Sequence, residues 1–148
     1  MSIPSAVDRS RWWGVIGYEV SMLRWLRSIS VPVSLLGNSI SEGSVLHTRN
    51  LCDFCTSSAA NDIKPSDLFE NYPEDPKYKT LGKLIIDLTE QYGNNKEGTT
   101  RWVFNKKLMH PTKERGDSFD YTPFLERVWP LLDNIVHEIE VLRGAQFP

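Results

Sequence analysis

The chain has 148 residues, a formal net charge of −2 and only two cysteines. This charge does not favour non-specific binding to nucleic acid, so any basic surface must be local. A chain of this length can bury about 70% of its unfolded surface in one core, and we expect a single domain over residues 1–148. No apolar run approaches the ~20 residues that cross a bilayer, and the first residues lack the order of a signal peptide. We therefore predict a cytoplasmic protein without membrane association.

Apolar residues recur at steps of three and four from about Asp8 to Ser30, which predicts a first helix that Pro32 ends or kinks. Glu19 projects into the same apolar arc. We expect the buried stripe of this helix to consist of Val15, Tyr18, Met22, Trp25 and Ile29, widened by Ile16, Leu23 and Leu26.

A capping box formed by Ser39 and Glu42 predicts a second helix from about Ile40 to Cys55. His47 projects into the apolar face of this helix. Arg49 lies at the border of that face. The second helix therefore offers two cationic side chains close to the interface with the first helix.

A carboxylate inside an apolar arc is costly to desolvate unless it gains a partner. The connection between the two helices is short, so they should pack as antiparallel neighbours. We therefore predict that Glu19 contacts His47 or Arg49 and fixes the register of the two helices. The cation that remains should then point towards the helix over residues 100–109. The alternative is that Trp12 lies outside the helix and Glu19 reaches water.

Cys52 and Cys55 both fall on the apolar face of the second helix. No further cysteine pair or nearby histidine completes a zinc set, and no strand precedes the pair as in a redox motif. We expect two buried, reduced and metal-free thiols.

Residues 56–77 are polar and contain three prolines. This composition predicts a long loop with one helical turn over Ser66–Asn71. Helical spacing returns between Tyr78 and Tyr92, and Gly93 provides a natural C-terminal stop.

A short helix is expected over about Thr100–Met109, followed by a last helix over about Pro123–Arg143 with a bend at Pro130. No segment alternates apolar and polar residues as a half-buried strand does. The sequence therefore predicts an all-α bundle of four to five helices, with the long Pro-containing loop between helices two and three.

Arg101 and Asn105 share one face of the short helix, and His110 lies at its C-terminal end. An arginine and a histidine near one helix end suit holding a phosphate and moving a proton. We expect Trp102 and Met109 to be buried, and Asn105 to be largely buried with a hydrogen-bond partner outside its own helix. The structural alternative is that Arg101 is solvated, Asn105 bonds a neighbouring loop and His110 caps the last carbonyls.

Two segments, Leu46–Phe54 and Asn105–Thr112, followed by Arg115, resemble a group of small bacterial helical proteins that are similar to HEPN (higher eukaryotes and prokaryotes nucleotide-binding) domains. The resemblance covers most of the chain and implies a HEPN-like bundle that forms a homodimer. It also implies RNA or a nucleotide as a partner.

Many HEPN domains are metal-independent ribonucleases with an Arg-polar-x4-His motif on one helix. Here Asn105 occupies the polar position and His110 the histidine position, whereas Phe104 stands in place of the arginine. Arg101, one turn earlier, and Arg49, on another helix, are the candidates to replace it in space.

From these observations we predict a HEPN-like binding or regulatory protein whose polar cluster holds a phosphate-bearing or nucleic-acid partner. The cluster consists of Arg49, Arg101, Asn105 and His110, with His47 and Arg115 as further binding residues and Glu19 as an orienting partner. One alternative is a toxin-type RNA endonuclease, paired with an antitoxin-like protein, that uses His110, Asn105 and Arg101. Another is a non-catalytic scaffold or dimerisation domain. No cofactor or metal is expected in any of these cases.

Overall fold

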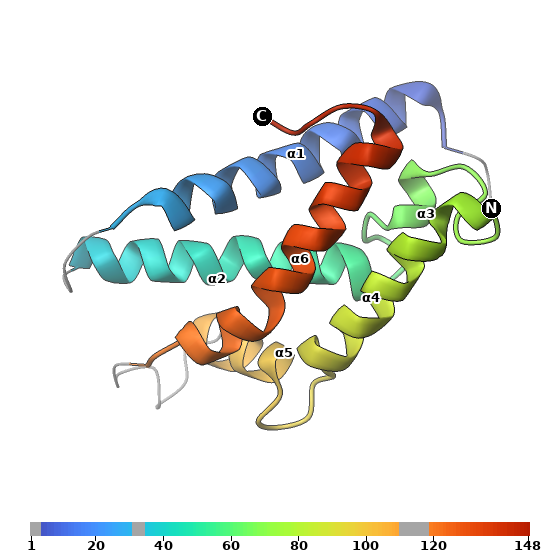
Figure 1. Cartoon of the computed structure of the whole chain (residues 1–148). Helices are drawn as coiled ribbons and strands as arrows, with labels where there is room; N and C mark the ends of the chain where they lie inside the picture. The colour runs from blue at the N-terminus through green and yellow to red at the C-terminus, as the bar shows by residue number, and fades with distance from the viewer. Residues whose placement is uncertain (1–3, 31–34, 110–118) are drawn as a thin grey trace.

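The structure, a computed structural model, describes residues 4–30, 35–109 and 119–148. Within these residues it contains helices and no strand (Figure 1), which confirms the predicted all-α class. The long helices are α1 (Ala6–Ser28), α2 (Leu35–Thr56), α4 (Lys79–Tyr92) and α6 (Thr122–Arg143). The short ones are α3 (Pro65–Leu68), the 3-10 helix η1 (Pro76–Tyr78), α5 (Thr100–Val103) and the π-helix η2 (Phe104–Met109). No helix in this part of the chain is long and apolar enough to cross a membrane.

Helix α2 lies in the middle of the bundle (Figure 1). It packs along α1 on one side and also contacts α4, α6 and η2. Helix α6 crosses α2 and packs along α4. Side chains on several sides of α2 therefore face other helices, and this arrangement decides which of its polar residues need partners within the protein.

The buried face of α1 contains the three residues predicted to widen the stripe but not most of the stripe itself. The residues at most 7% exposed are Ile16, Val20, Leu23 and Leu26. Three residues of the predicted stripe are 44–57% exposed, namely Val15, Tyr18 and Trp25. The two apolar sets lie roughly a third of a turn apart on the helix, and spacing alone does not tell which set the neighbouring helices cover. The first helix is therefore apolar on two faces and buries the smaller aliphatic one.

The start of α2 is also earlier than predicted, at Leu35 instead of about Ile40. The segment around Asn38 and Ser39 continues the helix, because weak helix formers cost at most about 1 kcal/mol each and packing can offset that cost. Gly43 contributes to this packing. A Cβ atom at Gly43 would lie 3.2 Å from Leu26 Cδ1, so glycine lets α1 and α2 approach closely.

Aromatic contacts pack the predicted long loop against α1. Its single α-helical turn, α3, begins one residue before the predicted turn and ends earlier. Phe69, which follows α3, packs edge-on against Trp13 of α1 with ring centroids 5.3 Å apart. Phe69 also packs against Tyr78, again at 5.3 Å, and Tyr78 donates a hydrogen bond to the carbonyl of Glu70. This segment is therefore part of the folded body.

Helix α6 follows the prediction closely, and its buried residues include Val128, Leu132, Ile135 and Ile139. Pro130 lies inside the helix, which changes direction in its N-terminal half (Figure 1). Gly144 ends it with a φ of 74°, a conformation that favours glycine.

The burial of Glu140 on α6 was not predicted. This side chain is 8% exposed, lies 2.9 Å from Arg24 Nη2 and accepts a hydrogen bond from the backbone N–H of Phe147. Burial opposes ionisation of Glu140, but the Phe147 N–H and Arg24 outweigh it and lower the pKa of the carboxyl. The contact folds the C-terminal segment back over α1.

The early start of α2 can be tested with Ser39→Pro. In a helix that begins at Leu35, residue 39 is already in the interior, and proline there should lower the free energy of unfolding by about 3 kcal/mol. If the helix began at about Ile40, residue 39 would precede it and proline would cost little. Chemical denaturation of Ser39→Pro and of the control Ser39→Ala distinguishes the two starts.

Candidate functional site

The predicted contact of Glu19 across the interface between α1 and α2 is present. His47 Nδ1 lies 2.6 Å from Glu19 Oε2, and the two side chains are only 9% and 14% exposed. Asn50 Nδ2 donates to the same carboxylate oxygen at 3.2 Å. The alternative of a solvated Glu19 is wrong, and Trp12 lies within α1.

The remaining cation, Arg49, points towards α5 and η2, as predicted. Its Nε donates to Asn105 Oδ1 at 2.8 Å, and Asn105 Nδ2 donates to Asn95 Oδ1 at 3.1 Å. Asn105 therefore has partners outside its own helix, although it is half-buried and not largely buried. Asn95 belongs to the turn before α5, and no role was predicted for it.

The short helix is partly a π-helix, which the sequence analysis did not predict. Thr99 caps its start by accepting a hydrogen bond from the backbone N–H of Trp102, and the π-helical turns begin at Phe104. A π-helix fits more residues into each turn than an α-helix does. Phe104 becomes fully buried and Trp102 only half-buried, so the prediction for Trp102 was wrong. Met109 was also predicted to be buried, but its side chain lies outside the described part of the chain.

Asp53 is the centre of the polar contacts, and it was missed as a site residue. Its Oδ1 accepts hydrogen bonds from Tyr92 Oη and Arg101 Nη2, both at 3.2 Å. Its Oδ2 lies 3.6 Å from Arg49 Nε. The signal available in the sequence was the spacing of four residues between Arg49 and Asp53, which brings opposite charges together on one helix face.

Tyr92 and Arg101 reinforce this cluster. Burial, with Cys52 and Asp53 nearby, raises the pKa of Tyr92, so its hydroxyl stays protonated and donates. The Arg101 guanidinium lies 5.4 Å from the centre of the Tyr92 ring. Arg101 is thus paired and 24% exposed, and it is not simply solvated.

A groove of about 450 Å³ opens beside these residues, between α1, α2 and residues 61–63. Its polar lining consists of Glu19, Arg49, Asn50, Asp53, Asn61 and Asp62. Arg49 uses its Nε for Asn105 and Asp53, and its two terminal nitrogens donate to none of the described residues. The groove therefore presents one firmly held guanidinium with its terminal hydrogen-bond donors available.

Two predicted site residues cannot be placed, because His110 and Arg115 lie outside the described residues. The structure brings the other five predicted site residues together in two groups of contacts on α2. These residues are Glu19, His47, Arg49, Arg101 and Asn105. One group joins Glu19 with His47, and the other joins Arg49 with Asn105 and Arg101 through Asp53. Among the described residues, no group of three or more His, Cys, Asp or Glu side chains is arranged to hold a metal ion.

Both cysteines are buried and free, next to this cluster but not part of it. Burial raises the pKa of Cys55 to about 12, and it also raises the pKa of Cys52 well above its usual range. A thiol with so high a pKa carries little thiolate at neutral pH and is a poor nucleophile. The placement of both thiols in the core is therefore confirmed.

No protein-family model, curated protein or solved structure matches the chain. Its function must therefore be inferred from the residues described above.

The Glu19–His47 contact predicts a loss of stability in Glu19→Gln. A hydrogen bond involving a charged group is worth about 1.5–3 kcal/mol, and the neutral amide retains only part of it. We expect Glu19→Gln to lower the melting temperature clearly in thermal denaturation at pH 7. The control Glu126→Gln removes an exposed carboxylate on α6 and should have little effect. Equal melting temperatures for the two variants would show that Glu19 contributes nothing to the interface.

Proposed function

We propose that the protein is a small HEPN-like binding module that recognises a phosphate-bearing partner, such as RNA or a nucleotide, through Arg49. The observation that supports this most directly is the way Arg49 is held. Its Nε donates a hydrogen bond to Asn105 and lies 3.6 Å from the Asp53 carboxylate, and Arg49 lines the groove. A guanidinium held in one orientation can form two parallel hydrogen bonds to a phosphate without first losing side-chain freedom.

The two arginines of the cluster outnumber its carboxylate. Arg49 and Arg101 share the carboxylate of Asp53, so these three side chains carry one positive charge in excess. The Asp62 carboxylate, which also lines the groove, accepts a hydrogen bond from the Ser57 hydroxyl. The Glu19 carboxylate is already engaged by His47 and Asn50. The homodimer implied by the HEPN resemblance remains part of the proposal, and the exposed apolar face of α1 with Tyr18 and Trp25 is the surface that could serve it.

A second candidate function is metal-independent RNA cleavage with His110, and one contact favours it. In the HEPN motif an arginine directly precedes the polar residue, and here Arg49 reaches the side chain of that residue, Asn105, from another helix. Arg49 would then take the place of the arginine that Phe104 replaces in the sequence.

The proposal is tested by titrating a fluorescently labelled single-stranded RNA and a mononucleotide with the wild type and Arg49→Gln. Loss of a charge-assisted hydrogen bond worth about 1.5–3 kcal/mol should weaken binding at least about tenfold. The control Lys83→Gln removes one exposed positive charge from α4 and should change the affinity less than about twofold.

The same RNA, analysed for fragments, separates the two candidates. Cleavage by the wild type that His110→Ala abolishes supports the ribonuclease, whereas binding without cleavage supports the binding module. If the wild type binds neither ligand, or if Arg49→Gln binds both as tightly as the wild type, the proposed role of Arg49 is wrong.

A further inference from the structure

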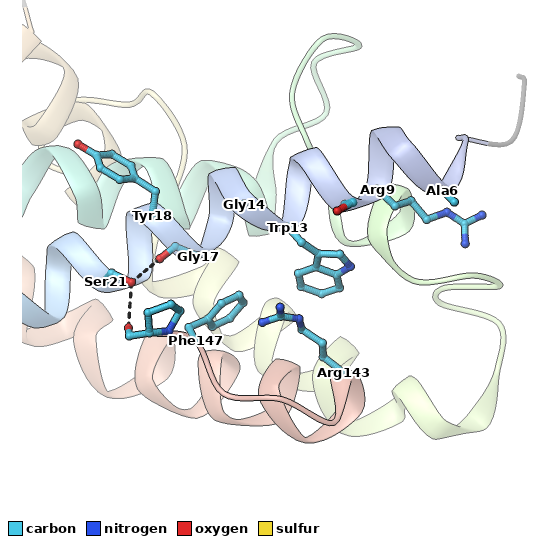
Figure 2. Close-up of a pocket in the computed structure, with 11 residues that line it drawn as sticks. Ala6, Arg9, Trp13, Gly14, Gly17, Tyr18, Ser21, Arg143 and Phe147 are labelled. Atoms are coloured by element: carbon cyan, nitrogen blue, oxygen red, sulfur yellow. Dashed lines mark hydrogen bonds between the residues drawn. The ribbon is translucent and has the colours of Figure 1, made fainter.

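A second groove follows the opposite side of α1 from the Arg49 groove. It lies between α1, the C-terminal end of α6 and the segment that follows α6 (Figure 2). Its volume is about 730 Å³, within the ~300–1,000 Å³ typical of sites for small molecules. None of the residues that the HEPN resemblance singled out lines it.

The walls of this groove are aromatic and firmly held. Trp13 and Phe147 lie with ring centroids 6.2 Å apart, and Phe147 is 5% exposed. Glu140 accepts a hydrogen bond from the backbone N–H of Phe147, and Arg24 donates one to the carbonyl oxygen of Phe147 at 3.2 Å. The Phe147 ring also packs closely against Gly17, where a Cβ atom would lie 3.2 Å from that ring. The groove is therefore formed before any ligand arrives.

The charged side chains that line the groove are two arginines. The Arg143 guanidinium lies 5.3 Å from the centre of the Trp13 ring and 5.0 Å from that of Phe147 (Figure 2). Arg9 lines the groove near the start of α1. Neither arginine forms a salt bridge within the described chain, whereas Arg24 and Arg27 on α1 both do. No Asp or Glu side chain lines the groove, and Pro148, which does line it, accepts a hydrogen bond from the Ser21 hydroxyl and forms no salt bridge with either arginine.

Gly14 leaves space in the groove that the protein itself does not use. It lies in the interior of α1, where glycine is among the weakest helix formers, and it lines the groove. A Cβ atom at Gly14 would meet no other atom within 4 Å, so packing within the chain does not require glycine here. An incoming flat group could approach the helix backbone at this position.

We propose that this groove binds a small organic anion with a flat aromatic body. The ring of the ligand would pack against Trp13 over Gly14, and its carboxylate or other acidic group would accept hydrogen bonds from Arg143 or Arg9. Apolar walls give such a ligand its contact area, and the two guanidinium groups select for negative charge. This site is separate from the Arg49 groove and does not depend on the function proposed there.

Calorimetric titration with 2-naphthoate and its neutral analogue 2-naphthamide tests the proposal. We expect the wild type to bind naphthoate at least about tenfold more tightly than naphthamide, because only the carboxylate can pair with a guanidinium. Arg143→Gln should weaken naphthoate binding about tenfold and leave naphthamide binding nearly unchanged. Equal affinities for the two ligands, or no detectable binding of naphthoate at millimolar concentration, would overturn the proposal.

Gly14→Leu distinguishes lost binding from lost folding. Leucine should fill the groove and abolish naphthoate binding, while the melting temperature stays the same or rises because leucine favours helix more than glycine does. The matched control is Gly82→Leu in α4, where a Cβ atom also meets nothing within 4 Å and which does not line the groove. That variant should bind naphthoate within about twofold of the wild type. Binding that survives in Gly14→Leu would show that the ligand does not occupy this groove.

Discussion

The structure depends on one constraint, which is that polar side chains of a central helix must find partners when other helices exclude water from them. Helix α2 meets this constraint with a separate contact to each neighbour. These contacts are His47 with Glu19 of α1, Thr48 with Trp129 of α6, Asp53 with Tyr92 of α4 and Arg101 of α5, and Arg49 with Asn105 of η2. Apolar packing brings the helices together, and these contacts specify how each one sits against α2.

The same contacts determine what the cluster can do. Asp53 balances only one of the two arginines that approach it, and Asn105 holds Arg49 at the Nε atom. A side chain fixed in this way serves both stability and recognition, since its terminal donors keep one direction. The second groove follows a similar logic. There Glu140 holds the C-terminal segment in place, and Arg143 packs over the Phe147 ring and forms no salt bridge with the described residues.

The sequence predicted features that follow from local rules. Helical spacing located the long helices, and the cost of desolvating Glu19 predicted its contact with His47. It did not predict features that depend on neighbours far away in the chain. Helix α1 has two apolar faces, and only the position of the other helices decides that Trp25 stays exposed. Spacing offered one partner for Asp53, Arg49 on the same helix, but it gave no signal for Tyr92, 39 residues away. It likewise gave none for the contact of Glu140 with Arg24, 116 residues away.

The most direct test of this account is hydrogen exchange of Asp53→Asn. The amide keeps the shape of the carboxylate but loses the charge that holds Arg49 and Arg101. If α2 positions α5 and η2 through Asp53, the backbone amides of residues 100–107 should exchange about tenfold faster or more, while those in the C-terminal half of α6 change little. Unchanged exchange over residues 100–107, or an equal increase throughout the protein, would contradict the claim that Asp53 positions this segment.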